Sequence, residues 1–596
     1  MEEMKFNEKK TDQKWRLSEF QYDKETGIYV VPAKAIHTID YSDGIKVENY
    51  ILKSIRNAKN ISDDSDELMR MAKDWPSYYH LGVGRSNILK SLDISHDVNV
   101  LELGSGCGPI TRYLGENFKS VDGVEGSPLR AQIAHERCRD LGNVRIFCSN
   151  FKHIQFDPTY DIVTLIGVLE YAPIYFADQH QQNAKESCLS LLKLAKTALK
   201  PDGVLIIAIE NKIGLKYWSG CPDDHTGKFF DGIHGYPADR GPITFSKKEI
   251  EALLKTAGFF NISFYYCFPD YKFASTIISD IGDEKDFYLH NWIEVPFTSY
   301  NIPRIYTFHE GLVIKTLSES GFLREFANSF LIVAGQSTAR IIRQPDWIAK
   351  KFSTKRRKEL RCVTTLKIKP KPYVEKKRLV GSNAEYSVAN NTTKMKHRVG
   401  DSSWYEGDLV TFEVFKALFE SDFKKKILDL LKMYYQELIS QYYTGIDDEE
   451  GYPVLQGTSF DFIFRNIIRR GRKLLYIDNE WWIENIPADY MMYRCITVDI
   501  IGLQRPWLTK KIRNVNKFTI ELIKHFFPKY GNVRHNKNKR LEECVQNLVS
   551  GGLSPIILSR KFQFLRNNNK IIWPLIKKIW DRLPENTKLK IRKWIE

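Results

Sequence analysis

The chain has 596 residues, of which 43% are hydrophobic and 27% charged, and its formal net charge at pH 7 is +16. A chain of this length is expected to form two or three domains with full cores. Its nine cysteines include no C-x-x-C pair, which argues against a zinc ribbon or a disulfide framework and favours a reducing cytoplasm. The N-terminus is polar and no apolar run approaches the roughly 20 residues of a membrane-spanning helix, so we expect neither a secretory signal nor a transmembrane segment.

The charge is distributed unevenly along the chain. Residues 1–300 sum to −7 and residues 301–596 to +23. Residues 501–596 alone hold 22 basic and 6 acidic residues. This asymmetry predicts an anionic partner for the C-terminal end, either a membrane surface, a nucleic acid or an acidic polymer.

Residues 1–95 precede the first expected strand and are interpreted as an N-terminal arm and a helical cap. They include the aromatic run Trp75-Pro76-Ser77-Tyr78-Tyr79-His80. Such a cap would close over a substrate; the alternative is an extension that serves packing only.

Residues 97–108 carry the most informative pattern. An apolar strand ends near Glu102 and is followed by Gly104, Gly106 and Gly108, after which a helix begins at about Ile110. Glycine lets the backbone pass close beneath a ligand because no Cβ blocks the approach. The spacing E-x-G-x-G-x-G differs from the G-x-G-x-x-G of nicotinamide-binding domains. It resembles motif I of the class I S-adenosylmethionine (SAM) methyltransferases, in which this turn cradles the methionine part of SAM.

The next two expected strands end in residues that fit the same family. The strand from Ser120 to Val124 leads into Glu125, where a carboxylate can accept hydrogen bonds from both ribose hydroxyls. The strand from Val144 to Cys148 leads into Asn150 and Phe151, where the resemblance implies a polar partner for the adenine amine and an apolar one for the ring. Many family members carry Asp at the position of Asn150, but an amide oxygen can also accept a hydrogen bond.

Two further strands complete a doubly wound α/β sheet, from Asp161 to Ile166 and from Val204 to Ile209. We therefore predict a class I methyltransferase domain with a Rossmann-like sheet at residues 96–275, in which Glu170 binds SAM or the backbone. The alternative is a doubly wound domain that binds another nucleotide or none.

A polar, glycine-rich insert after the fifth strand spans about residues 210–236 and should lie where ligands bind in open α/β sheets. Together with the neighbouring stretches, residues 75–275 resemble bacterial methyltransferases of polysaccharide and lipopolysaccharide biosynthesis. His225 is the candidate general base, oriented by Asp224; the alternative is that these residues only order a loop. A second hypothesis assigns Glu170, Glu210 and Asn211 to a magnesium site, since hard oxygen ligands suit that ion.

Residues 331–500 resemble a protein-kinase-like or aminoglycoside-phosphotransferase-like domain of α+β fold, joined through a linker at residues 276–330. Asp461 and Asn466 have D-x-x-x-x-N spacing, and an apolar strand then leads to Asp478. The resemblance implies that Asp461 is the base, that Asn466 and Asp478 hold Mg on ATP, and that Lys351 binds the ATP phosphates. Ser459 stands where the family has a histidine, and no glycine-rich loop is found, so an inactive pseudokinase is the alternative.

Residues 501–596 are interpreted as a basic helical tail. The stretch from Ile571 to Leu583 would place apolar residues on one helical face, with lysines, an arginine and tryptophans around it. A basic amphipathic helix of this kind is typical of membrane-surface binding. A helix packed on the preceding domain is the alternative, and nucleic acid is the less favoured partner.

The sequence thus predicts a SAM-dependent methyltransferase that modifies a sugar hydroxyl or a sugar-linked phosphate in capsule or O-antigen synthesis. Expected partners are a glycan or lipid-linked glycan, glycosyltransferases and an anionic membrane, and the expected location is cytoplasmic, on the inner face of the cell membrane. Two alternatives are an RNA methyltransferase with a basic RNA-binding half and a SAM-binding membrane scaffold with a pseudokinase domain.

Overall fold

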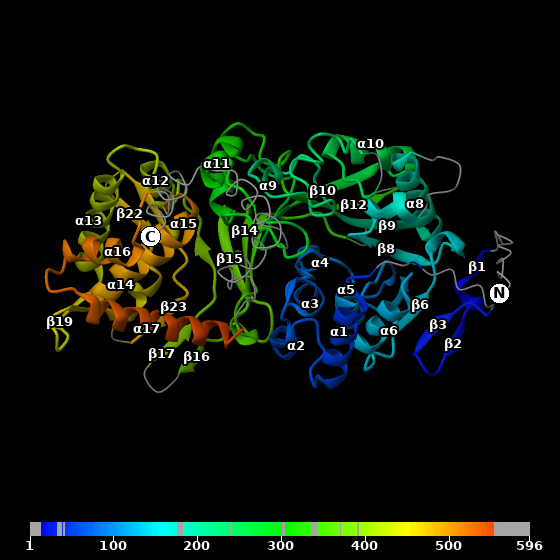
Figure 1. Cartoon of the computed structure of the whole chain (residues 1–596), viewed down its shortest axis with the longest axis horizontal. Helices are drawn as coiled ribbons and strands as arrows, with labels where there is room; N and C mark the ends of the chain where they lie inside the picture. The colour runs from blue at the N-terminus through cyan, green and yellow to red at the C-terminus, as the bar shows by residue number, and fades with distance from the viewer. Residues whose placement is uncertain are drawn as a thin grey trace, which may run out of the picture.

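The structure is a computed structural model with its N-terminal half at one end of the long axis and its C-terminal half at the other (Figure 1). It describes residues 14–553 except for 33–38, 40–41, 176–182, 239–240, 301–303, 337–341, 370, 390–392, 472, 485 and 509–510. The predicted amphipathic helix from Ile571 to Leu583 lies outside the described residues. No described helix is long and apolar enough to cross a membrane.

A parallel sheet forms the centre of the N-terminal half. Its five strands have the order β6-β5-β4-β8-β9. Their bounds are β4 (Asn99–Leu103), β5 (Ser120–Glu125), β6 (Val144–Cys148), β8 (Tyr160–Ile166) and β9 (Leu199–Glu210). All five lie within a few residues of the predicted strands, because each contains a buried apolar segment, as expected for a sheet covered on both faces.

Helices cover both faces of this sheet, so the doubly wound arrangement is confirmed (Figure 1). One face packs against α8 (Ala184–Ala198) and α10 (Lys247–Ala257). The other packs against α5 (Pro109–Asn117) and α6 (Pro128–Arg137). Local signals fix the helix ends: α8 and α10 each begin with a capping box, and α10 ends at a left-handed glycine, Gly258.

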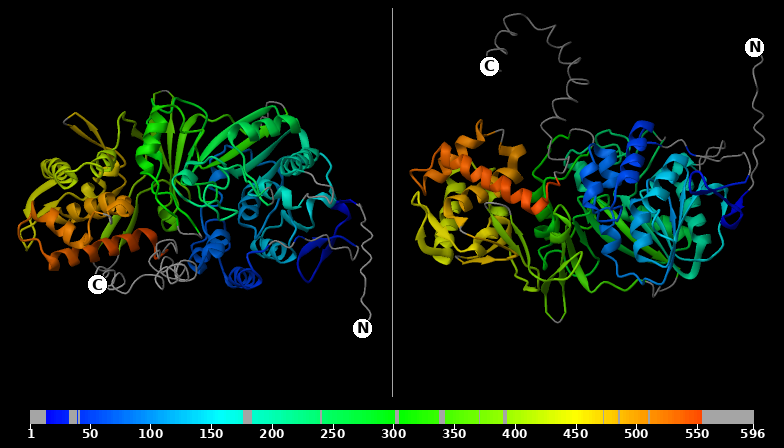
Figure 2. Two further views of the ribbon diagram at one scale, coloured as in Figure 1. Left: turned by 45° about the horizontal axis from the view of Figure 1, so that its top comes forward. Right: turned by 90° about the horizontal axis from the view of Figure 1, so that it is seen from below.

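The first 95 residues contribute strands as well as the predicted helices. The hairpin β2 (Gln21–Asp23)–β3 (Ile28–Val30) extends the sheet beyond β6. A short strand β1 (Trp15–Arg16) pairs with β7 (Ile154–Gln155). The helical part lies against α5 and α6 in the views of Figures 1 and 2 and comprises α1 (Ile45–Asn57), α2 (Asp66–Met71), α3 (Trp75–Leu81) and α4 (Asn87–Lys90).

Two antiparallel strands continue the sheet after β9. β12 (Ser329–Gly335) inserts between β9 and β10 (Asn261–Phe268) and pairs with both over seven residues. The domain boundary predicted at residue 331 therefore falls inside a strand of the N-terminal sheet. The sequence analysis did not identify β12, because its ladders join segments more than 60 residues apart.

This placement makes a truncation prediction. A chain ending at residue 275, the predicted domain end, will lack β12 and leave the facing edges of β9 and β10 unpaired. It will also lose Phe330, Leu331 and Ile332, which are fully buried and each contribute about 1.5–3 kcal/mol. We expect a fragment of residues 1–336 to unfold cooperatively when its thermal melting is followed by circular dichroism, and a fragment of residues 1–275 to aggregate. Equal melting temperatures of the two fragments would contradict the assignment of β12 to the N-terminal sheet.

The same sheet runs on into the C-terminal half. β11 (Thr276–Ile278) pairs with β10 on one side and with β13 (Trp347–Ser353) on the other. The series ends with β14 (Cys362–Lys367), β15 (Tyr373–Arg378) and β18 (Ser402–Ser403). One 14-stranded sheet thus joins the two halves.

A second hydrophobic core organises the C-terminal half. Three small sheets belong to this half. The first consists of β16 (Tyr386–Ala389), β17 (Lys394–His397) and β23 (Trp481–Ile483), and the second of β19 (Tyr443–Asp447), β20 (Pro453–Leu455) and β24 (Ile486–Pro487). The third is the hairpin of β21 (Ile467–Arg470) and β22 (Lys473–Tyr476). Its helices are α12 (Thr411–Ala417), α13 (Phe423–Tyr442), α14 (Ala488–Arg494), the π-helix Cys495–Gly502, α15 (Leu503–Leu508), α16 (Val515–Lys524) and α17 (Asn532–Ser550); α11 (Glu310–Glu319) packs against α12.

The described part of the predicted basic tail belongs to this core. α16 and α17 both pack on α14. Arg534 in α17 is buried and donates to Asp489 in α14 at 2.7 Å. Helices α16 and α17 are therefore an integral layer of the C-terminal half, since Leu522, Ile523 and Val545 bury their side chains there.

Candidate functional site

The glycine turn after β4 forms the floor of a cavity of about 250 Å³, here called the glycine-turn pocket, whose walls include Glu102, Gly104, Gly106, Glu125 and Phe151. A Cβ on Gly104 would meet Val168 at 2.5 Å, so packing requires glycine at this position. A Cβ on Gly106 would meet nothing within 4 Å, and Gly106 has φ +55°. Gly106 thus presents open backbone to the cavity, as predicted for a turn that lies beneath a ligand. Gly108 caps α5 but is not among the wall residues.

Two acidic residues of the strand ends have different surroundings. Glu125 accepts the backbone N–H of Gly106 at 2.8 Å and that of Ser127 at 2.9 Å, so its carboxylate is fixed at the cavity wall. Glu102 accepts the hydroxyl of Thr111 at 2.5 Å, and burial raises the pKa of Glu102 to about 8. Phe151 lines the cavity as predicted, whereas Asn150 caps a short helix by accepting the N–H of Lys152 at 3.1 Å.

The N-terminal cap supplies the opposite wall, through Trp75, Tyr79 and His80 of α3 and through Arg85. Arg85 was missed by the sequence analysis. Its guanidinium is buried, donates to the Lys272 carbonyl and the Tyr79 hydroxyl, both at 2.8 Å, and forms no ion pair with any described carboxylate. Its Nε has no hydrogen-bond partner. A buried guanidinium at a cavity wall that lacks an ion-pair partner among the described residues indicates an anionic group on the ligand.

His225 lines the far end of the same pocket, but Asp224 does not orient it. Nε2 of His225 lies 3.1 Å from Glu210, and Nδ1 lies 3.0 Å from the hydroxyl of Tyr171. Burial alone would lower the pKa of His225, but the Glu210 carboxylate overcomes this and raises it to about 9. The prediction of an Asp224–His225 pair is therefore wrong: the two side chains leave the loop in different directions, and Glu210 takes the orienting place.

Asp224 instead belongs to a buried ion-pair network. It pairs with Lys216, and at 3.3 Å with Lys272. Lys272 also pairs with Glu210, and Lys216 lies 3.4 Å from Asp270. The network fixes the insert against the strand ends.

Glu170 also lies at this end of the pocket, in a short helical turn (Leu169–Tyr171) after β8. It is fully buried, and neither carboxylate oxygen has a hydrogen-bond partner. Burial and the charge of Glu210 raise the pKa of Glu170 to about 7. Asn211, its proposed magnesium co-ligand, faces elsewhere: its amide donates to the carbonyls of Glu325 and Ala327. The ligand set Glu170, Glu210 and Asn211 is therefore not assembled.

The part of the chain that forms the glycine-turn pocket was compared with known protein families. Residues 64–263 match a family model described as a methyltransferase domain, and this range contains the glycine turn, the strand ends and the insert. The match shows that the chain contains a methyltransferase domain. No curated protein matches the chain.

Several solved structures resemble part of this chain. Phosphoethanolamine N-methyltransferase 2 of Haemonchus contortus, in complex with S-adenosyl-L-methionine, is 17% identical over 42% of this chain and 52% of its own, with a TM-score of 0.26. A possible histamine N-methyltransferase of Thermotoga maritima is 17% identical over 43% and 88%, with a TM-score of 0.24. A putative methyltransferase of Bacillus halodurans is 16% identical over 43% and 99%, with a TM-score of 0.25. This chain thus spans about half the length of the first of these proteins.

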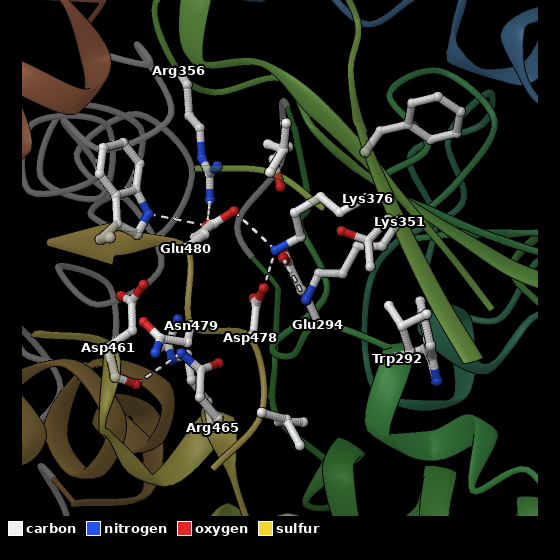
Figure 3. Close-up of a pocket in the computed structure, with 18 of the residues that line it drawn as sticks. Trp292, Glu294, Lys351, Arg356, Lys376, Asp461, Arg465, Asp478, Asn479 and Glu480 are labelled. Atoms are coloured by element: carbon white, nitrogen blue, oxygen red, sulfur yellow. Dashed lines mark hydrogen bonds and ion pairs between the residues drawn. The ribbon is translucent and has the colours of Figure 1, made fainter. Parts of the chain in front are cut away.

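A second and larger cavity, of about 830 Å³, lies between the methyltransferase domain and the C-terminal core. We call it the Lys376 pocket; Figure 3 shows its polar wall. The methyltransferase side contributes Tyr78 and Phe273, and the C-terminal side contributes Asp461, Asn466 and Asp478. The three residues predicted from the D-x-x-x-x-N pattern thus meet at one cavity.

Asp461, Asn466 and Asp478 have different contacts and different exposure. Asp461 is buried with one oxygen unpartnered, and burial raises its pKa to about 7. Asn466 donates to the Asp461 carbonyl at 3.0 Å. Asp478 is held at φ +63°, with its side chain 41% exposed.

Both Lys376 and the predicted Lys351 line this cavity, but the lysine that pairs with Asp478 is Lys376 on β15 (Figure 3). Lys376 pairs with Asp478, and with Glu480 at 2.8 Å. Lys351 on β13 pairs with Glu294 at 3.4 Å and lowers the pKa of Glu294 to about 2. The sequence analysis chose Lys351 because β13 is a largely apolar strand, whereas β15 is mostly charged, and strand pairing decides which lysine reaches Asp478.

Proposed function

We propose that the methyltransferase domain binds SAM in the glycine-turn pocket and transfers its methyl group to an oxygen atom of a bacterial cell-surface glycan. The observation that carries SAM binding is that three features lie in one cavity: open glycine backbone at Gly106, a fixed carboxylate at Glu125 and, at Arg85, a buried guanidinium without an ion-pair partner among the described residues. Glu125 would accept the ribose hydroxyls, and Arg85 would bind the carboxylate of the methionine part.

The reaction is a displacement at the methyl carbon. The acceptor oxygen forms the new C–O bond as the C–S bond breaks, its electron pair passes to sulfur, and S-adenosylhomocysteine leaves. A hydroxyl acceptor must also lose its proton, and we place that step at the His225 end of the pocket, where Glu210 and Tyr171 hold the imidazole.

The glycan acceptor is supported by the resemblance of residues 75–275 to methyltransferases of polysaccharide synthesis. The direct test incubates the protein with methyl-labelled SAM and lipid-linked glycans extracted from the source cells, with RNA as the competing acceptor. We expect label in the glycan. Label in RNA, with RNA binding that weakens steeply as salt rises, would establish the alternative. SAM binding without transfer to either acceptor would favour a scaffold.

A second candidate activity is phosphoryl transfer at the Lys376 pocket. The order of helix α13, Asp461, Asn466, hairpin β21–β22 and Asp478 supports it, with ATP and Mg as the proposed ligands. Adding magnesium-ATP to the methylation assay tests the connection: label that depends on ATP would mean that the acceptor is phosphorylated first.

We also propose that the C-terminal residues beyond 553 bind an anionic membrane, where lipid-linked glycans and glycosyltransferases would be encountered. Removal of residues 565–596 should release the protein from anionic vesicles. Retained binding would place the membrane contact elsewhere.

Arg85 offers a sharp test of the SAM assignment. Arg85→Met should weaken SAM binding in calorimetry by about 10–150-fold, the value of a charge-assisted hydrogen bond of about 1.5–3 kcal/mol. Binding of decarboxylated SAM, which lacks the group that Arg85 would contact, should hardly change. Equal weakening of both ligands would mean that Arg85 acts through the fold instead.

A further inference from the structure

Three side chains at the His225 end of the glycine-turn pocket gather from separate elements. Glu170 follows β8, Glu210 ends β9, and His225 comes from the insert. Because β8 and β9 are adjacent and parallel, their ends bring both carboxylates to one edge of the sheet. One ligand atom from each of the three residues lies within 4.8 Å of the other two.

The spacing of these atoms fits ligands of one metal ion. Nε2 of His225 and Oε2 of Glu210 are 3.1 Å apart. Two ligands at about 2.1 Å from one ion, at angles of about 90–110°, lie about 3.0–3.4 Å apart. An ion could therefore replace the shared proton between them without moving either side chain far.

The outer contacts are those that orient metal ligands. The Tyr171 hydroxyl bonds to Nδ1 of His225, which leaves Nε2 for the interior of the cluster. Lys272 pairs with Oε1 of Glu210, which leaves Oε2 facing His225. Such partners fix the direction and basicity of the ligands.

Glu170 is the independent observation that points to a bound cation. Its side chain is 0% exposed and both oxygens lack a hydrogen-bond partner. A buried carboxylate without a partner costs several kcal/mol, and a cation removes that cost. The other carboxylates of the region already have partners, so the ion would bind here.

The charges of the region lead to the same conclusion. Glu210, Asp224 and Asp270 share two ammonium groups, those of Lys216 and Lys272. Without a metal, the imidazolium of His225 matches the third carboxylate. Once His225 gives up its proton to bind an ion, one negative charge is unmatched, and ionised Glu170 adds a second. A divalent cation balances both when His225 is neutral.

We propose that Glu170, Glu210 and His225 bind one divalent cation. Two carboxylates and one imidazole suit an ion such as Mn²⁺ or Zn²⁺ rather than Mg²⁺, which prefers oxygen ligands alone. The role of the ion rests on the proposed function: because His225 lines the pocket, an ion on Nε2 would contact the acceptor hydroxyl and lower its pKa. His225 would then be a ligand and not the base.

A second group, Cys362, His397 and Glu480, has a similar spacing but is already filled by cations. The Arg356 guanidinium lies 3.5 Å from the sulfur of Cys362, 3.2 Å from Nε2 of His397 and 2.5 Å from Glu480. Lys376 also pairs with Glu480. This group therefore provides a matched control.

The experiment titrates Mn²⁺ into the full-length, chelator-treated protein and follows free Mn²⁺ by electron paramagnetic resonance, with Zn²⁺ as competitor. We expect one site per chain, weakened at least about tenfold in Glu170→Gln and in His225→Gln and unchanged in His397→Gln. Glu170→Gln keeps the shape of the side chain, so its melting temperature in chelator should not fall. Calorimetry with SAM shows whether each variant retains the methyl-donor pocket.

The outcomes separate the two proposals. Loss of Mn²⁺ binding in Glu170→Gln with SAM binding intact supports the cation site. The cation proposal is overturned if the protein binds SAM normally but binds neither Mn²⁺ nor Zn²⁺. It is also overturned if only His397→Gln loses the ion. In both cases the assignment of the SAM site is unaffected. Mn²⁺ binding without SAM binding would instead refute the proposed function.

Discussion

Gly106→Arg will abolish SAM binding while the protein stays folded. The wild-type position faces open space, since a Cβ would meet nothing within 4 Å, so the new side chain extends into the glycine-turn pocket instead of into the core. Its backbone has φ +55°, which costs a residue with a side chain about 1–2 kcal/mol. Calorimetry should show SAM affinity reduced at least about a hundredfold, a loss of about 2.8 kcal/mol.

Gly142→Arg is the matched control. Gly142 is exposed before β6, has ordinary φ and also has no atom within 4 Å of an added Cβ. It adds the same charge and bulk to the domain but lies outside the pocket, so SAM affinity should be unchanged. If Gly106→Arg bound SAM with wild-type affinity, the ligand site would have to lie elsewhere.

The sequence predicted the methyltransferase sheet well because the signals are local. Each parallel strand is an apolar run, and the residues that follow it reach the same edge of the sheet by topology alone. Glu125, Gly106 and Phe151 were found in this way, and all three line the cavity.

The sequence was a weaker guide to side-chain contacts, both between residues far apart in the chain and between sequence neighbours. Arg85 had no recognisable spacing to the glycine turn, and its importance comes from burial without an ion-pair partner among the residues that the structure describes. Asp224 is next to His225 in sequence, yet the Lys216 and Lys272 ammonium groups attract it away. A signal for Glu210 did exist, because it ends β9 as Glu125 ends β5, but the partner of His225 could not be chosen from sequence alone.

The second half shows the same limit on a larger scale. The positions Asp461, Asn466 and Asp478 follow a short pattern, and the structure brings them to one cavity. The lysine that faces them is set by strand pairing. β14 lies between β13 and β15, so a lysine on β13 and one on β15 differ by two strands in the sheet.

The two lysines give a decisive variant pair. Lys376→Met should weaken magnesium-ATP binding at least about tenfold, since it removes the cation between Asp478 and Glu480 that would contact the phosphates. Lys351→Met should bind magnesium-ATP more tightly than Lys376→Met does, because Lys351, although it lines the same cavity, pairs with Glu294 and not with Asp478.

Stability must be separated from binding in this test. Lys376 is 8% exposed and compensates the buried Glu480, so Lys376→Met will also lower the melting temperature, although Arg356 still pairs with that carboxylate. The readout is therefore a calorimetric titration of magnesium-ATP at a temperature where both variants are folded. Loss in Lys351→Met alone would restore the sequence prediction. Wild-type protein that binds no nucleotide would refute a nucleotide site, because the wild-type pocket holds every residue on which the proposal depends.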